Sequence, residues 1–195
     1  IVTGAHTDGL IIEDKQCRGV RFTKDGSQKE ARVGREVIVS AGSVNSPQIL
    51  ELSGIGQPEL LQRHGVQVCH ALPGVGENLR DHYAPRMKYE ITASGLTYND
   101  KMRGIGTVLQ ALRYAMTGTG LLGLPAAPLR AYVCSRDGLA SPDINISIVP
   151  FLVAEGFKLA KESGITVITH PLRSESTGSI HIGSPDSKSP PKINF

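Results

Sequence analysis

The stretch VIVSAGSVNSPQILELSGIG, residues 37–56, decides the fold that the sequence predicts. Its first three residues, 37–39, are β-branched or β-preferring and predict a buried strand. Side chains become small over 40–43, so a tight turn should follow the strand. The Ser-Pro pair at 46–47 then predicts a helix, with a capping hydroxyl and a proline at the first helical position. Glycines within 53–56 should end that helix, because glycine tolerates a positive φ.

A strand, a small-residue turn and a helix N-terminus direct amide donors and a helix dipole toward one place. That arrangement suits a phosphate or a ribose. An ordinary strand-to-helix connection in an α/β layer is the alternative reading of the same pattern. The residues alone leave both readings open.

The order of residues within 42–56 is more specific, since it reads GSxxSPxILxxSGIG. This pattern resembles the second signature of the glucose-methanol-choline (GMC) oxidoreductases, which are FAD-dependent enzymes that oxidise alcohols. The resemblance implies an α+β chain: part of an FAD-binding α/β domain, followed by an antiparallel-sheet substrate domain with packed helices. We place the boundary after residue 72, which gives domains 1–72 and 73–195.

The composition is that of a globular protein with a formal net charge of +3 and dispersed Lys and Arg residues. With few aromatics and no basic block, a nucleic-acid partner is not expected. No apolar run reaches the roughly 20 residues that span a bilayer, and we predict a cytoplasmic location. Three widely spaced cysteines, Cys17, Cys69 and Cys134, favour free thiols over a disulfide framework or a zinc site.

The resemblance implies which residues lie near the cofactor, FAD. Thr7 matches the position on a strand whose backbone contacts the adenine end, and Ala41 and Gly42 form the bare turn described above. A second matching segment, G-x-N-L-x-D-H in residues 76–82, adds Asn78, Asp81 and His82 as structural or flavin-neighbouring residues. From the residues alone, such a loop could also ligate a metal or position a base, but a turn that satisfies its own side chains is the commoner outcome.

The remaining pattern predicts strands and helices around these motifs. An Asp-Gly hairpin turn at 24–27 should join two strands near the start of the chain. A helix is expected over 58–64, and a second over 105–116, whose apolar stripe should be core. The expected strands of the second domain are 86–91, 131–134, 143–150, 166–172 and 178–183, which would form one antiparallel set.

Two elements of a complete GMC enzyme are not among these residues. The glycine pairs at 54/56, 74/76 and 104/106 lack the third glycine of a G-x-G-x-x-G fingerprint, and the family's catalytic histidine lies in a C-terminal segment beyond this stretch. We therefore expect a middle segment of a longer polypeptide, partnered by its remaining N- and C-terminal parts and by a small alcohol. We predict no catalytic residue and no metal ligand here, and no tight FAD binding or turnover by these residues alone.

Several alternatives fit the same sequence. A lyase or a flavin photoenzyme of this family would share the fold. A non-catalytic binding or scaffold module derived from it is a hypothesis of another class. A serine hydrolase fits worse, because no G-x-S-x-G elbow is present and Ser43, Asp81 and His82 have no spacing that implies a triad.

Overall fold

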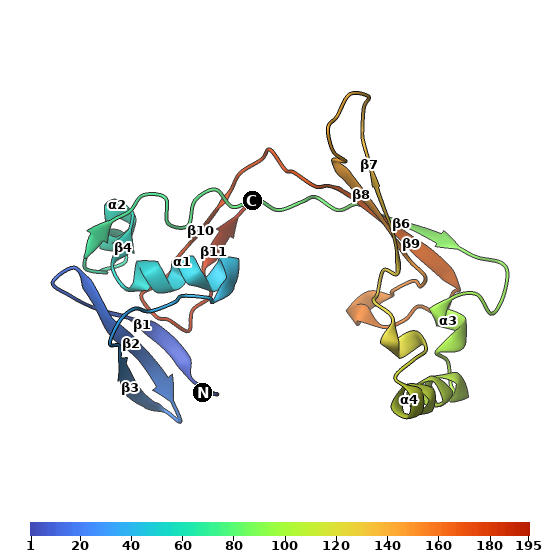
Figure 1. Cartoon of the computed structure of the whole chain (residues 1–195), viewed down its shortest axis with the longest axis horizontal. Helices are drawn as coiled ribbons and strands as arrows, with labels where there is room; N and C mark the ends of the chain where they lie inside the picture. Colours follow the sequence, from blue (N-terminus) through green and yellow to red (C-terminus); the bar gives the residue numbers. More distant parts are fainter. The chain divides into compact units, whose positions relative to one another are not determined.

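The computed structural model describes residues 1–195, apart from the side chain of residue 157. The chain divides into two compact units, which are described separately below (Figure 1). The first unit comprises Ile1–Asp81 together with Glu175–Phe195, and the second comprises His82–Ser174. These limits differ from the division at residue 72 because the last segment of the chain pairs and packs within the first unit.

The first unit begins with a three-stranded antiparallel meander. Its strands are β1 (His6–Glu13), β2 (Gln16–Lys24) and β3 (Ser27–Arg32). Asp25 and Gly26 form the two-residue turn between β2 and β3, with φ values of 52° and 73°. Two positive φ angles characterise the hairpin turn whose twist matches the flanking strands. The predicted hairpin is therefore confirmed.

The start of the stretch 37–56 differs from the prediction of a strand over 37–39. Residues 37–39 are not a strand, and Ile38 is 79% exposed. A strand needs a neighbour that accepts and donates its backbone hydrogen bonds, and no described strand pairs with these residues. Helix α1 (Gly42–Leu52) also begins four residues before the predicted Ser46 cap, so Pro47 lies inside it. Its predicted end is correct, since Ser53 is the C-cap and Gly54 has a φ of 80°.

Helix α2 (Pro58–Arg63) follows, with proline at its first position and His64 as its C-cap, as expected. Between the helices, β4 (Ile55–Gly56) pairs in parallel with β5 (His70–Ala71). The small core of this unit consists of Leu60, Leu61 and Ile182. Ile182 comes from the returning segment, where β10 (Ser179–His181) pairs antiparallel with β11 (Lys192–Asn194).

The second unit contains an antiparallel sheet of four strands in the order β6-β9-β8-β7 (Figure 1). These strands are β6 (Arg86–Glu90), β7 (Leu129–Val133), β8 (Ile144–Val149) and β9 (Gly164–Pro171). All four were predicted to within a few residues. The fifth predicted member, 178–183, is not part of this sheet, because β10 pairs with β11 in the first unit.

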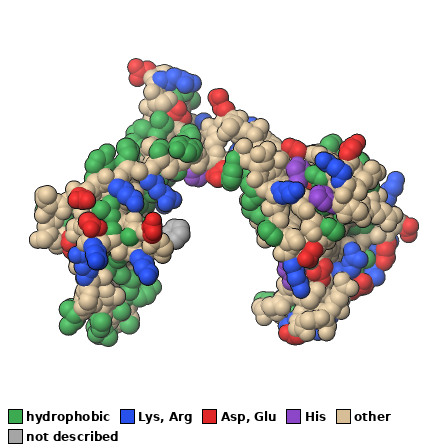
Figure 2. All heavy atoms as spheres, turned by 180° about the vertical axis from the view of Figure 1, so that it is seen from behind, with side chains coloured by type: hydrophobic (Ala, Val, Ile, Leu, Met, Phe, Trp, Pro, Cys, Tyr) green, Lys and Arg blue, Asp and Glu red, His purple; other side chains and the backbone are tan. Residues whose placement is uncertain are grey.

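Helices of the second unit are α3 (Tyr98–Lys101), α4 (Ile105–Thr117) and the 3-10 turns η1 (Leu121–Gly123) and η2 (Glu155–Phe157). The predicted helix over 105–116 is confirmed, but the prediction that its stripe is core is wrong. Ile105 is 78% and Met116 77% exposed. Green apolar side chains cover α4 at the lower left of Figure 2. The reason is that no described element packs over this face of the helix.

Candidate cofactor and substrate sites

The first unit contains a hollow of about 380 Å³ where the start of β1, helix α1 and the segment 187–191 meet. Thr7 and Ala41, far apart in the sequence, both line it. Asn45 and Gln48 project from α1 into the same lining. The sequence therefore placed two of its six candidate residues in one hollow, and it missed the two polar side chains from α1. The positions of Asn45 and Gln48, about one and two turns into the helix, could be predicted only with knowledge that the helix starts at Gly42.

The N-terminus of α1 leaves its amide donors available. Ala41, its N-cap, makes no side-chain capping bond, and the first turn carries no acidic residue. Gly42 has a φ of 82°, and nothing lies within 4 Å of the place where its Cβ would be. Open backbone donors at the end of an 11-residue helix suit an electron-rich group such as a ribose or a phosphate oxygen. These residues thus fit part of a dinucleotide such as FAD.

Hydrogen bonds hold the wall of the hollow that comes from the returning segment. Ser187 donates its hydroxyl to Asp8 Oδ1 at 2.9 Å, and Thr23 donates to Asp8 Oδ2 at 2.7 Å. Gln48 Nε2 donates to the carbonyl of Ser189 at 2.7 Å. Burial raises the pKa of Asp8, but the two hydroxyl donors outweigh it and leave that pKa below its usual value of 3.8. Asp8 therefore acts as an ionised anchor for this wall.

The other three candidates lie elsewhere, and none of them lines this hollow. Asn78 has a φ of 60°, and its Oδ1 accepts a hydrogen bond from Arg80 Nε at 3.3 Å. Asp81 ends the first segment of the first unit, and His82 begins the second unit. The ring of His82 stacks on that of His170, with their centroids 4.1 Å apart. Asn78, Asp81 and His82 are therefore not part of the lining of this hollow.

The Nδ1 atom of His170, on β9, is buried without a hydrogen-bond partner. Desolvation lowers the pKa of His170 from its usual value of 6.5, and the neighbouring His82 and Arg130 lower this pKa further. The ring is thus held in its neutral form over a wider pH range than a free histidine. His181, by contrast, has hydrogen-bond partners for both ring nitrogens, Glu51 and Glu77.

Glu51 is a buried carboxylate that the sequence reading missed. It is 0% exposed on α1, accepts the backbone N–H of Ile182 at 2.7 Å through Oε2, and lies 2.7 Å from His181 Nδ1 through Oε1. A carboxylate only accepts, so Nδ1 is the donor. An acidic residue between the apolar Leu50 and Leu52 was the available signal, because a charge is seldom fully buried without partners. Glu51 ties α1 to β10.

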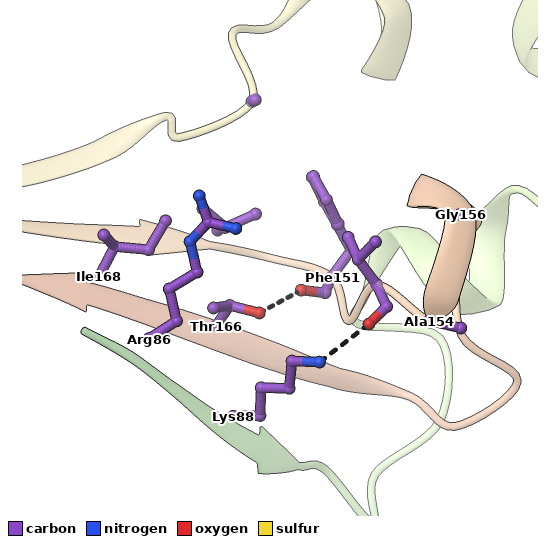
Figure 3. A pocket seen from close by; sticks show the side chains of 10 residues that line it. Arg86, Lys88, Phe151, Ala154, Gly156, Thr166 and Ile168 are labelled. Carbon is purple, nitrogen blue, oxygen red and sulfur yellow. Dashed lines mark hydrogen bonds between the residues drawn. The ribbon is translucent and has the colours of Figure 1, made fainter. Parts of the chain in front are cut away.

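The second unit has its own cavity, of about 530 Å³, over one face of its sheet. Its wall is largely apolar and includes Val149, Phe151 and Ile168. Two cationic side chains, Arg86 and Lys88, project from β6 on the same side (Figure 3). An apolar cavity with a few polar groups is the usual form of a small-molecule site. The sequence reading had located the strands but not this cavity.

The described residues contain no group of three or more His, Cys, Asp or Glu side chains that could hold a metal ion. Within the same residues, none of the helices is long and apolar enough to cross a membrane. All three cysteines are free, and Cys69 and Cys134 are exposed.

The fold is that of oxidases of known structure. It matches a formate oxidase with a TM-score of 0.89 and 25% identity, covering 98% of this chain and 38% of that one. It matches an Aspergillus oryzae formate oxidase, studied for its FAD modification, with a TM-score of 0.87 and 25% identity over 97% of this chain and 38% of that one. The predicted α+β fold class is confirmed, and the FAD of the second structure agrees with the predicted cofactor.

The sequence comparisons agree with the fold. The family described as GMC oxidoreductase matches residues 1–84. The oxygen-dependent choline dehydrogenase of Chromohalobacter salexigens is 34% identical over the whole chain, and the chain spans 35% of its length. The chain belongs to the GMC oxidoreductase family, as the signature in residues 42–56 predicted. It spans about a third of the length of the curated relatives it matches.

Proposed function

We propose that this chain is part of an FAD-dependent oxidoreductase that oxidises a small alcohol. The first unit, which includes residues 1–72 and the returning segment, holds the nucleotide end of FAD, and the second unit supplies part of the substrate wall. The observation that carries this proposal is the hollow where Thr7 and Ala41 meet beside the uncapped N-terminus of α1. Membership of the GMC family supports the same function.

In this function FAD supplies the redox chemistry by accepting a hydride from the alcohol carbon. The residues of this chain bind and orient. The extended backbone at Thr7 and the open turn at Ala41 and Gly42 offer donors and acceptors to the adenosine portion. Asn78, Asp81 and His82 stay proposed neighbours of the flavin. The group that takes the hydroxyl proton would come from other parts of the polypeptide, since we assign no catalytic residue here.

The names of the relatives leave the substrate open, because one acts on choline and the others on formate. That the substrate is a small-molecule alcohol is part of the proposal. So is the cytoplasmic location predicted from the sequence.

The test uses the complete polypeptide that carries this chain, with Ala41→Trp as the perturbation. An indole at position 41 would occupy the hollow that we assign to the nucleotide. We expect the variant to lose most of its FAD, measured as the ratio of flavin to protein absorbance after gel filtration. The folded variant should also take up added FAD at least about tenfold more weakly, because the cofactor and the indole compete for one volume.

The matched control is Ala93→Trp, at an exposed position in a bend of the second unit. It should keep its FAD, and a primary alcohol should bleach the flavin under anaerobic conditions. Full FAD occupancy in folded Ala41→Trp would contradict the assignment of the hollow. A control protein that holds FAD which no alcohol reduces would contradict the proposed reaction.

A further inference from the structure

The cavity of the second unit contains two like charges on one strand. Arg86 pairs across the sheet with Ile168, and Lys88 with Thr166. Cross-strand partners share a face of the sheet, and residues two apart on a strand do as well. Thr166 is also the partner of Val149 on the next strand. The register therefore places both cations over the same cavity floor, as Figure 3 shows.

No acidic side chain among the described lining residues balances these charges. The residues that line the cavity include no Asp or Glu. Glu90 follows on the same face of β6, but it is not in the lining and forms no ion pair with either cation in the described part of the chain. Lys88 Nζ donates to the carbonyl of Val153 at 3.0 Å, which holds it at the rim. The side chain of Arg86 has neither a hydrogen bond nor an ion pair among the described residues.

The apolar part of the wall strengthens the attraction between these two cations and a negatively charged ligand. Val149 and Thr166 are buried, and Ile168 and Phe151 are half-buried around the two cations. Arg86 and Lys88 are themselves exposed, but the apolar wall beside them reduces the water around a bound ligand, so the charge of that ligand interacts more strongly with theirs than it would in bulk solvent. A guanidinium presents a planar fork of donors that matches a carboxylate. An ammonium nearby adds a point charge of the same sign.

We propose that this cavity selects alcohols that carry an anionic group, such as a carboxylate, on an apolar carbon chain. Arg86 binds that group, and Lys88 reinforces the positive potential from the rim. A quaternary ammonium alcohol is disfavoured, because the two cations of the lining repel it and the described lining residues include no carboxylate to attract it. The volume of about 530 Å³ accommodates a small acid. This proposal rests on the proposed function and names its substrate class.

The test compares three alcohols of matched length in the complete polypeptide: γ-hydroxybutyrate, a butanediol with terminal hydroxyls, and hydroxypropyl trimethylammonium. We expect kcat/KM to be highest for the hydroxy acid and lowest for the ammonium alcohol. Arg86→Gln should lower kcat/KM for the hydroxy acid about tenfold or more, because a charge-assisted hydrogen bond is lost. The same change should alter kcat/KM for the neutral diol less than about twofold. Lys88→Gln should act in the same direction with a smaller effect.

A binding measurement and a control variant separate the role of Arg86 from effects on turnover and on net charge. Calorimetric titration with butyrate, which cannot be oxidised, should show a Kd that rises in Arg86→Gln, so that binding is read without turnover. Lys101→Gln, which removes an exposed cation of α3 outside the cavity, is the control for net charge and should leave both measurements unchanged.

Equal losses in Arg86→Gln and Lys101→Gln, or an unchanged preference in Arg86→Gln, would overturn the role of Arg86. A wild-type preference for the ammonium alcohol would overturn the substrate class while leaving the oxidoreductase function standing. A flavin that no alcohol of any charge reduces would overturn the proposed function, and this inference with it.

Discussion

The buried carboxylate of Glu51 permits a quantitative test of what joins α1 to β10. Glu51→Leu keeps a side chain of similar size but removes both acceptor oxygens. The N–H of Ile182, a residue that is 2% exposed, then loses its acceptor with no water to replace it, whereas the side chain of His181 is 15% exposed and its Nδ1–H can reach solvent. A buried donor without a partner costs about 1–3 kcal/mol. Since 1.4 kcal/mol is a factor of ten, the local opening equilibrium should rise roughly 5- to 150-fold.

Amide hydrogen exchange at Ile182 in the complete polypeptide measures that equilibrium directly, without assuming that the whole protein unfolds in one step. We expect protection of this amide to fall by the factor above, and by less in Glu51→Gln, whose single oxygen satisfies one donor. Glu59→Leu, at an exposed position in the first turn of α2, is the matched control. Protection at Ile182 that changes less than threefold in Glu51→Leu would refute the view that this carboxylate holds β10 in place.

Two more predictions concern a glycine and a histidine. Gly54→Ala should destabilise the first unit by about 3 kcal/mol or more, because it combines left-handed strain with a clash between the new Cβ and the carbonyl oxygen of Gln67. Gly65→Ala has a similar φ but open space around the new Cβ, so it should cost only about 1 kcal/mol. Equal denaturation midpoints for the two variants would be inconsistent with the clash. His170 should titrate below 6.5 in an NMR titration, because its ring is desolvated, and His82→Ala should raise that pKa. Its folded-state pKa is depressed, so the unfolded chain binds this proton more readily and stability should fall as the pH drops through about 6.5; a pKa at or above 6.5 would rule this out.

Local chemistry was sufficient to predict many elements. The Asp-Gly turn, the proline-initiated helix α2 and the strands of the second sheet each depend on residues close in sequence, and all of them are observed. The family followed from the motif in 42–56, whose spacing reflects turn and helix geometry. Thr7 and Ala41 could be predicted as neighbours in space only because that resemblance related β1 to α1.

What the sequence did not predict depends on distant partners. A β-branched run such as 37–39 becomes a strand only if another strand pairs with it. The apolar stripe of α4 is buried only if something covers it, and the periodicity does not identify what does. The start of α1 at Gly42 required a positive φ there rather than a hydroxyl cap at Ser46. The cavity with Arg86 depended on the register between β6 and β9, which single-strand patterns do not contain.

The return of residues 175–195 to the first unit gives the chain the topology of an insertion. Residues 82–174 leave one compact body and both of their ends connect back to it. Among the described residues, the strands of the outer segments pair with one another: β1-β2-β3, β4-β5 and β10-β11. Under the proposed function, substrate range could diversify by changes within the insert while the nucleotide-holding framework keeps its pairing intact.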